Sequence, residues 1–318
     1  MDKTGTEFLE QNALIFDIKR DCSEDGPGIR TTVFFKGCPL SCIWCQNPEG
    51  KSKKAELLFN TKLCRPSKCG TPCIDVCEAG CLLRLDNSLQ VDHSTCTRCD
   101  NCFKVCPTKA LEPAGYWIGR QELLYRVLID KPFYLSTNGG ITLSGGEATM
   151  QMPFLRYFLK ELKRERIHIA LETCGFFNLE TFRTQILPYL DLIYFDLKLI
   201  DDEESRRYTG HANHIIIENF ASLSRELQVP IIPRIPLVPN ITATRGNLIA
   251  LSQFLRSHNI QECSLVPYNP LWQDKLISLG LSPEYQHSSY MSSEDERACV
   301  QYFSKSRAPD IQNEVLKV

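Results

Sequence analysis

Three cysteines in one short segment are the residues best placed to do chemistry. Cys38, Cys42 and Cys45 are separated by three and two residues, so one tight loop can point three thiolates at a single small object. Thiolate sets of this kind favour iron–sulfur clusters or zinc. The next cysteine, Cys64, lies beyond a polar run of lysines, so the loop cannot supply a fourth thiolate. Three ligands on a four-iron cluster leave one iron open, whereas a structural zinc site would have to borrow a distant cysteine or histidine.

A second group of cysteines lies between residues 62 and 113, where nine of the 16 cysteines occur and long apolar runs disappear. Its later half matches the bacterial ferredoxin run, in which the first three cysteines hold one four-iron cluster and the fourth serves another. These cysteines are Cys96, Cys99, Cys102 and Cys106. The earlier half is spaced more loosely, with Glu78 where proline is usual. Its cysteines are Cys64, Cys69, Cys73 and Cys77.

The two runs predict two crossed clusters. Cys64, Cys69, Cys73 and Cys106 would hold one, and Cys77, Cys96, Cys99 and Cys102 the other. Cys81 aligns with Ala110 of the later run, which predicts a spare thiol, although the sequence leaves open whether Cys81 replaces a ligand. Metal binding stabilises small segments that have little core, so the clusters could be purely structural, and an electron conduit to the first site is the alternative. The irregular first run also leaves open that only the second cluster forms.

Composition narrows the class of protein. With 318 residues and 43% hydrophobic content, the chain can bury one large core, or one core and a small module. A net charge of −2 and the lack of any Lys/Arg run of five argue against nucleic-acid binding. No apolar stretch suits a signal peptide or a membrane span, which predicts a cytoplasmic protein without a membrane partner. In the cytoplasm, cysteines are more often metal ligands than disulfide partners. Four isolated cysteines are interpreted as small buried side chains. These are Cys22, Cys174, Cys263 and Cys299.

The elements that must position these groups are predicted to alternate between strands and helices. Apolar runs predict six strands, each followed by a helix, and hence a parallel sheet with right-handed crossovers. The strands are expected over Thr32–Lys36, Ile141–Leu143, Ile167–Leu171, Leu192–Phe195, Ile231–Ile235 and Ser264–Val266. Polar residues cluster at the carboxyl ends of these strands, the edge at which parallel sheets and barrels bind ligands. They are Cys38, Glu147, Glu172, Asp196, Lys198, Arg234 and Asn269.

Two further motifs join the cysteine loop in a family resemblance. The loop, with Trp44 directly before its third cysteine, resembles the signature of the radical S-adenosylmethionine (SAM) superfamily. The Asp25–Arg30 turn (Asp-Gly-Pro-Gly-Ile-Arg) and the segment from Gly139 to Glu147 resemble one branch of it, the activating enzymes of glycyl radical enzymes. Within that branch the chain looks similar to pyruvate formate-lyase-activating enzyme with a ferredoxin-like insert. The resemblance runs from about Asn12 to about Asn269.

The resemblance implies a fold of the α/β class, a partial (β/α)6 TIM-type radical SAM barrel with an inserted ferredoxin-like module that carries two [4Fe–4S] clusters. The barrel would comprise residues 12–60 and 114–290, and the insert residues 61–113. Residues 291–318 would form a C-terminal helix and tail. The open side of such a barrel would admit a protein loop and exclude water once the loop docks.

The resemblance also implies the cofactors and their ligands. SAM would chelate the open iron of the Cys38/Cys42/Cys45 cluster, which makes three [4Fe–4S] clusters in all. Glu147 would accept the ammonium group of SAM, and Arg234 would pair with its carboxylate because a guanidinium binds two oxygens. Lys198, in an Asp-x-Lys element, joins the three cysteines as a catalytic residue. The expected SAM contacts are Trp44, Gly145, Gly146, Glu147, Glu172, Thr173, Asp196, Lys198, Arg234 and Asn269.

The implied activity is that of a radical SAM oxidoreductase that works under anaerobic conditions. Reduced by flavodoxin or ferredoxin, it would cleave SAM to a 5′-deoxyadenosyl radical and take a hydrogen atom from a glycine of a partner glycyl radical enzyme. A monomer is expected. Two alternatives stay open: a radical SAM enzyme that acts on a small molecule or another peptide, and a non-catalytic iron–sulfur electron carrier or zinc protein. The sequence does not name the partner.

Overall fold

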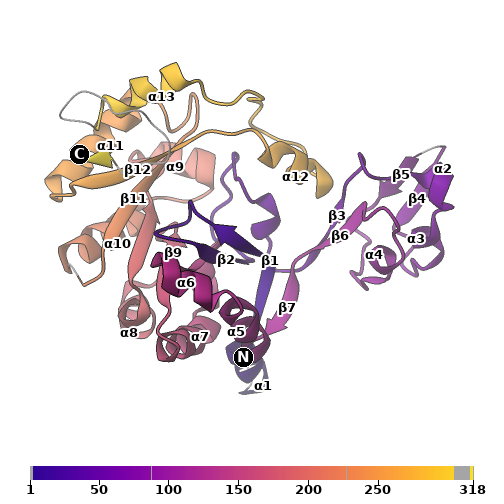
Figure 1. Ribbon diagram of the computed structural model, residues 1–318. Coiled ribbons are helices and arrows are strands. Elements are labelled where there is room, and N and C mark those ends of the chain that lie inside the picture. The colour runs from indigo at the N-terminus through magenta and orange to yellow at the C-terminus, as the bar shows by residue number, and fades with distance from the viewer. Residues whose placement is uncertain (1–2, 87, 227, 304–315, 318) are drawn as a thin grey trace.

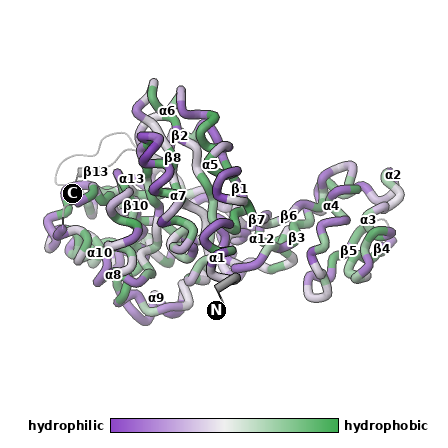
Figure 2. Tube along the Cα trace, turned by 90° about the horizontal axis from the view of Figure 1, so that it is seen from below, coloured by the Kyte–Doolittle hydropathy of each residue, from purple (hydrophilic) through white to green (hydrophobic). Residues whose placement is uncertain are grey.

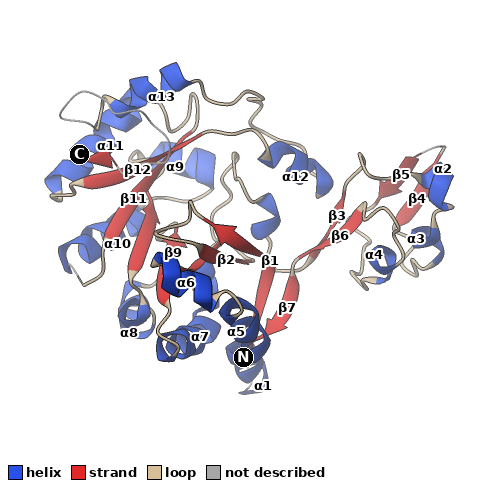
Figure 3. Ribbon diagram, in the orientation of Figure 1, coloured by secondary structure: helices blue, strands red, loops and turns tan. Residues whose placement is uncertain are grey.

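A nine-stranded mixed sheet forms the centre of the protein (Figures 1 and 3). The computed structural model describes residues 3–86, 88–226, 228–303 and 316–317. Six neighbouring strands are parallel and follow chain order: β2 (Arg30–Phe35), β8 (Gly140–Gly145), β9 (His168–Thr173), β10 (Leu192–Asp196), β11 (Ile231–Leu237) and β12 (Glu262–Pro267). The predicted parallel sheet is therefore confirmed.

Antiparallel strands extend both edges of this parallel core. On one side β1 (Asn12–Cys22) pairs with β2, and β7 (Tyr116–Gly119) pairs with β1. On the other side β13 (Leu316–Lys317) pairs with β12. The sequence indicates a strand over Leu14–Ile18 only, and β1 is longer because it pairs with both β2 and β7. Of the predicted C-terminal segment 291–318, residues 304–315 and 318 lie outside the described part.

Helices connect the parallel strands and pack their apolar sides against the sheet. Helix α7 shows why: Pro153 fits its first turn, and Phe154, Leu155, Phe158 and Leu159 recur on one face and are fully buried. The described helices of this part are α1 (Lys3–Gln11), α5 (Arg120–Leu128), α6 (Lys131–Thr137), α7 (Met152–Arg164), α8 (Leu179–Gln185), α9 (Asp202–Thr209), α10 (His214–Glu226), α11 (Arg245–Ser257), α12 (Trp272–Ser278) and α13 (Ser293–Val300). No helix in the described ranges is both long and apolar enough to cross a membrane.

The cysteine-rich segment projects from the sheet on a two-stranded ribbon (Figures 1 and 2). The ribbon pairs β3 (Glu56–Phe59) with β6 (Leu111–Ala114) in antiparallel register. Beyond it lie α2 (Pro66–Cys69), α3 (Pro72–Asp75), β4 (Leu82–Leu85), β5 (Ser88–Val91) and α4 (Asn101–Lys104). The segment has its own small apolar cluster, in which several cysteines pack, separate from the large core under the sheet. A core this small gives few apolar contacts, so cluster binding would add to its stability.

Candidate active site

A cavity of about 320 Å³ opens at the carboxyl ends of the parallel strands. The three cysteines of the loop, Cys38, Cys42 and Cys45, line it together. Nine of the ten side chains or glycines expected to contact SAM also line it: Trp44, Gly145, Gly146, Glu172, Thr173, Asp196, Lys198, Arg234 and Asn269. The sheet brings these residues together because neighbouring parallel strands end at the same edge. Glu147 is the tenth, and it does not line the cavity.

The cysteine loop is held by backbone hydrogen bonds on two sides. On one side, Cys38 N donates to Lys51 O at 3.0 Å, which continues the path of β2. On the other, Ser41 N donates to Thr209 O at 2.8 Å and Ile43 N to Tyr208 O at 3.1 Å, both at the end of α9. These bonds fix the loop without using its sulfurs. The thiols are therefore left free to serve as ligands.

The donor set of this loop fits an iron–sulfur cluster. Its thiols share one wall of the cavity, and sulfur is the donor that such clusters require. Burial raises the pKa of Cys42 to about 12 and that of Cys45 to about 11, so both are neutral thiols until a cation displaces the proton. Among the described residues, no three His, Cys, Asp or Glu side chains are arranged to hold a single metal ion.

A network of four charged side chains lines the same cavity as the cysteine loop. Arg234 Nε donates to Asp196 Oδ1 at 2.9 Å, and Arg234 also pairs with Glu172. Lys198 Nζ lies 3.1 Å from Asp196 Oδ2, and Ser144 donates to Glu172. Two cations and two carboxylates thus balance one another. A zwitterion such as the methionine part of SAM can exchange partners with this network without leaving a charge unpaired.

The charged side chains of the network favour one another's ionised forms. Burial alone would raise the pKa of Asp196, but Arg234 and Lys198 outweigh burial and hold it below its usual value. Burial raises the pKa of Glu172, and the charge of Arg234 opposes that rise. Burial would lower the pKa of Lys198, yet Asp196 and Cys42 raise it above its usual value. Lys198 is therefore a fixed cation beside the cysteine loop at neutral pH.

Glu147 accepts hydrogen bonds that connect the ends of two neighbouring strands. Its side chain is fully buried and accepts hydrogen bonds from Thr149 N at 3.1 Å, Thr149 Oγ1 at 2.7 Å, Thr173 Oγ1 at 2.9 Å and Cys174 N at 2.7 Å. These contacts join the segment after β8 to the end of β9. The expected contact between Glu147 and the ammonium group of SAM stays a prediction, since the carboxylate already has this full set of donors.

The two glycines before Glu147 let the backbone approach the cysteine loop. Gly145 has a φ of +115°, and a Cβ atom there would lie 2.2 Å from Phe35 O. A Cβ atom on Gly146 would lie 2.4 Å from both Gly37 O and Gly50 O. Only glycine allows this approach. The glycines therefore set the position of the loop relative to β8.

Replacing the buried carboxylate should reduce the stability of the fold. In a Glu147→Gln variant, the amide NH2 group would face donors such as Cys174 N, so at least one buried N–H would lose its acceptor. We expect a loss on the order of 3 kcal/mol in the free energy of unfolding, measured by urea denaturation. Glu180→Gln is the matched control, because that side chain is 78% exposed and should change stability by less than about 0.5 kcal/mol. Equal midpoints for the two variants would contradict this role of Glu147.

Some residues of the cavity were not expected from the sequence. Cys174 was interpreted as an isolated buried thiol, and it is buried, but it also lines the cavity with the cysteines of the loop. The expectation that Cys174 is isolated is therefore wrong, whereas Cys22, Cys263 and Cys299 are buried away from this cavity as expected. Cys174 directly follows the strand end at Thr173, and that position was the signal that could have found it.

The Asp25–Arg30 turn also reaches the site. Asp25 lines the cavity, and Thr32 Oγ1 donates to its carboxylate. Arg30 is fully buried and clamps the turn to β8, with Nε donating to Thr142 Oγ1 at 2.6 Å and Nη2 to Ile141 O at 2.7 Å. The turn is therefore more than a connector, because it delivers a carboxylate to the cavity wall.

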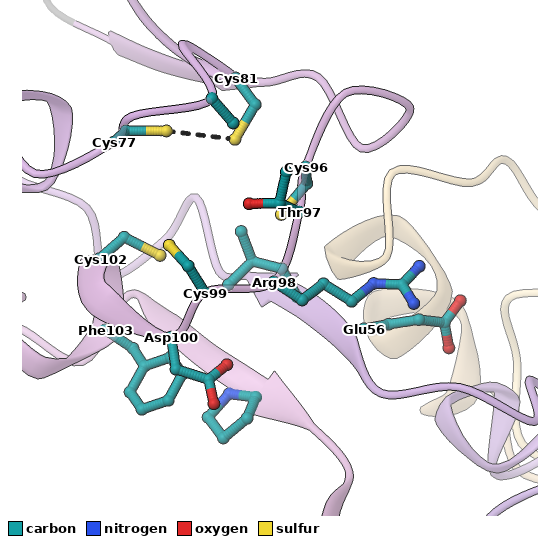
Figure 4. Close-up of a pocket in the computed structure, with 13 residues that line it drawn as sticks. Glu56, Cys77, Cys81, Cys96, Thr97, Arg98, Cys99, Asp100, Cys102 and Phe103 are labelled. Carbon is teal, nitrogen blue, oxygen red and sulfur yellow. Dashed lines mark hydrogen bonds between the residues drawn. The ribbon is translucent and has the colours of Figure 1, made fainter.

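The projecting segment holds two further cysteine-lined cavities. One is lined by Cys77, Cys81, Cys96, Cys99 and Cys102 (Figure 4). The other is lined by Cys64, Cys69, Cys73 and Cys106. The structure thus groups the cysteines in the two crossed sets predicted from spacing, and adds Cys81 to one of them. In both cavities the donor set fits a four-iron cluster.

A buried ion pair links the first of these cavities to the cysteine loop. Lys36 is fully buried two residues before Cys38, and its Nζ lies 2.8 Å from a carboxylate oxygen of Glu56. Lys36 Nζ also donates to the backbone oxygen of Glu49. Glu56 in turn lines the cavity of Cys96, Cys99 and Cys102. This cavity is therefore tied directly to the strand that leads into the active-site loop.

Comparisons with known proteins agree with the cysteine sets. Residues 24–67 match the family model described as a 4Fe-4S single cluster domain, and residues 89–112 match a 4Fe-4S binding domain. The first match spans the Cys38/Cys42/Cys45 loop, and the second spans the ferredoxin-like run. The chain therefore contains sequence typical of iron–sulfur proteins at both places.

Full-length relatives cover most of the chain. It is 36% identical to the isethionate sulfite-lyase activating enzyme of Nitratidesulfovibrio vulgaris, over 82% of this chain and 86% of the relative. It is also 36% identical to the trans-4-hydroxy-L-proline dehydratase activating enzyme of Clostridioides difficile, over 83% and 87%. With the choline trimethylamine-lyase activating enzyme of Oleidesulfovibrio alaskensis it shares 35% identity, over 93% and 97%. The chain belongs to the activating enzymes of glycyl radical enzymes, within the radical SAM superfamily.

Proposed function

We propose that the large cavity is the place where this chain binds SAM and activates a partner enzyme. As a member of its family, the protein reductively cleaves SAM to methionine and a 5′-deoxyadenosyl radical, which takes a hydrogen atom from a glycine of a glycyl radical enzyme. The observation that carries the proposal is the meeting of three cysteines with a balanced charge network at one sheet edge.

Each side chain of the cavity has a role in holding and orienting the cofactors. Cys38, Cys42 and Cys45 hold the cluster, which supplies the electron when SAM is bound. Arg234 pairs with the carboxylate of the methionine part, and its exchange of partners frees Asp196 or Glu172 for the ammonium group or the ribose hydroxyls. Lys198 keeps its positive charge beside the cysteine loop, where the cluster is proposed to bind. The protein orients SAM and sets the electrostatic surroundings of the cluster, and the cofactors carry out the chemistry.

Five further residues form the rest of the cavity wall. Trp44, Gly145, Gly146, Thr173 and Asn269 line it and limit the space left around a bound nucleoside. Glu147 positions Thr173 rather than facing the cavity directly. Asn269 is tied to the cysteine loop, because Gln46 Nε2 donates to its backbone oxygen at 3.1 Å.

The fold supports a partial (β/α)6 barrel with an inserted ferredoxin-like domain. Six parallel strands in chain order, with polar residues at their carboxyl ends, are what such a barrel requires. We place the insert at about residues 56–114, slightly wider than 61–113, because among the described strands β3 and β6 pair with each other and with no third strand. The barrel then takes residues 12–55 and 115–290, and the C-terminal helix and tail residues 291–318.

Two auxiliary clusters in the insert bring the total to three. The set of Cys64, Cys69, Cys73 and Cys106 holds one, and Cys77, Cys96, Cys99 and Cys102 hold the other. Support comes from the way each set lines a single cavity. Since Glu56 connects the second set to Lys36 and so to the active-site loop, an electron passed along the insert would arrive beside β2. Flavodoxin or ferredoxin is the proposed donor.

Removal of one auxiliary ligand should cost iron but spare the active-site cluster. A Cys99→Ala variant should lose up to about four of about twelve irons per chain, because one cubane loses a ligand. The measurement is iron and sulfide per chain after anaerobic reconstitution, with SAM cleavage followed in parallel. Cys263→Ala, a fully buried cysteine outside every cavity described here, is the control and should keep all its iron. Unchanged iron in Cys99→Ala would count against ligation by Cys99.

The partner is proposed to be a glycyl radical enzyme with a glycine loop that enters the open side of the barrel. The relatives are named for a sulfite-lyase, a dehydratase and a trimethylamine-lyase, at nearly equal identity, so identity does not choose among them. The test is anaerobic incubation of the monomeric protein with each of these partner enzymes, SAM and a reductant. A glycyl radical signal with one partner supports the proposal.

Other outcomes would favour the alternatives. A 5′-deoxyadenosine product without a protein radical in any partner would point to a radical SAM enzyme for a small molecule or another peptide. A protein that contains zinc and no iron or sulfide would not be an activating enzyme at all. About twelve irons per chain are expected from three cubanes.

A further inference from the structure

Five thiols surround one cavity of the insert, although a four-iron cluster takes four cysteines. Cys96, Cys99 and Cys102 come from the ferredoxin-like run, and Cys77 and Cys81 come from the loop between α3 and β4. Figure 4 shows Cys77 and Cys81 on one side of this cavity, with Cys99 and Cys102 across from them and Cys96 next to Cys81. The extra thiol needs an explanation, because Cys81 has no counterpart in the other cavity.

Cys81 is built into the cavity wall. Its Sγ lies 3.4 Å from the Sγ of Cys77, and it lines the cavity together with Cys96. Its side chain is 3% exposed and packs in the small core of the insert. Its backbone is held as well, since Asp92 N donates to Cys81 O at 2.8 Å. Cys81 therefore sits between the fourth thiol of one run and the first thiol of the other.

Cys77 is held differently. It ends a short helical turn, with its N–H donating to Ile74 O at 3.0 Å, and it is half-buried. The backbone N–H groups of Gly80, Cys81 and Leu82 approach its sulfur. One loop of five residues thus presents two sulfurs, four positions apart, to the same space.

We propose that Cys77 and Cys81 are alternative fourth ligands of the cluster held by Cys96, Cys99 and Cys102. The proposal rests on the auxiliary clusters of the proposed function. In the exchange, the iron–sulfur bond to one cysteine breaks as the bond to the other forms, and the proton of the incoming thiol passes to the outgoing thiolate. The 3.4 Å contact between the two sulfurs provides the path. No electron is gained or lost, so no oxidant or reductant is needed.

The two ligand states differ in their surroundings. A cluster bound through Cys77 keeps the backbone N–H groups of the loop on its sulfur, whereas one bound through Cys81 has a ligand in the small core. Hydrogen bonds to cluster sulfurs and solvent exposure both set the reduction potential. The exchange therefore gives one cluster two reduction potentials.

The test compares four proteins after anaerobic reconstitution: the parent, Cys77→Ala, Cys81→Ala and the double variant. Each single variant should keep the iron content of the parent, and the two should give different electron paramagnetic resonance (EPR) spectra for the reduced auxiliary cluster. The double variant should lose this spectrum, or convert it to that of a three-iron cluster. The SAM-dependent signal of the active-site cluster should persist in all four, which reports an intact barrel.

Control variants separate the possible failures. Loss of iron in Cys77→Ala equal to that in the double variant, with none in Cys81→Ala, would assign ligation to Cys77 alone and overturn the proposal, while the auxiliary cluster stands. The reverse pattern would assign ligation to Cys81 alone and would overturn the proposal equally. Cys99→Ala is the positive control for loss. Full iron and an unchanged spectrum in Cys99→Ala would overturn the auxiliary cluster itself, and the ligand pair with it.

Discussion

A Cys42→Ala variant is expected to produce no 5′-deoxyadenosine from SAM and a reductant. The loop supplies three sulfurs to the large cavity, and Cys42 is its buried middle member. Without it, two loop thiols are left for a cluster that needs three, so the electron that breaks SAM has no source. The product should fall to background, and the glycyl radical in the partner should disappear with it. Chromatography of the anaerobic reaction measures the first, and EPR spectroscopy the second.

A matched control shows that this loss is specific. Cys22 is also a buried cysteine, but it lies in β1 and lines none of the three cysteine cavities. Cys22→Ala should keep the SAM-dependent spectrum and form 5′-deoxyadenosine at the parent rate. Cys174 is the substitute ligand to consider, since it lines the same cavity as the loop cysteines. If Cys42→Ala still forms the product, a Cys42→Ala/Cys174→Ala double variant decides whether Cys174 replaced it, and activity in that double variant would remove the loop from the active site.

The parallel core of the fold could be predicted from the sequence because its signals are local. A run such as Ile167–Leu171 is apolar and β-branched, and the polar residues that follow it mark the strand end. Strand β1 shows the limit, because its length is set by pairing with both β2 and β7. Strand β7 lies beyond the insert, and no pattern in a single sequence predicts which distant segment joins an edge.

The site could be predicted as a set of residues more readily than as a set of contacts. Placing polar residues at strand ends correctly gathered Glu172, Asp196 and Arg234 at one edge. It could not show that Glu147 is fully enclosed, because that depends on donors from Thr149 and Cys174 that fold against it. The position of a residue in the sequence indicates which strand end it follows. The direction of its side chain depends on which hydrogen-bond partners the fold places around it.

The cysteine assignments illustrate the same distinction. Spacing predicted which cysteines of the insert belong together, since ferredoxin-like runs bind in a crossed pattern. Cys81 was predicted to be spare because alignment places it opposite an alanine, but folding sets its sulfur beside that of Cys77. Alignment compares positions along the chain. It contains no information on where a loop turns its side chains, and the turn at Gly80 decides that here.

An Arg234→Ala variant is expected to bind SAM about 30-fold more weakly, which corresponds to about 2 kcal/mol for a charge-assisted hydrogen bond. Arg234 holds Asp196 and Glu172 in place and faces the cavity where the carboxylate of SAM is proposed to bind. Its loss leaves two carboxylates that repel a third. Arg234→Lys keeps the charge but not the planar fork, so its affinity should lie between those of the parent and Arg234→Ala.

The measurement is the dissociation constant of SAM for the cluster-loaded protein, from the change of the cluster spectrum on titration. Arg206→Ala is the matched control, because Arg206 is an exposed helix residue whose pair with Asp202 spans one turn of α9, and surface pairs of this kind contribute little. That variant should bind SAM as the parent does. An Arg234→Ala protein with its cluster intact and an unaltered dissociation constant would clear Arg234 of the role, and the carboxylate would then have to be held by Lys198, the other cation beside Asp196.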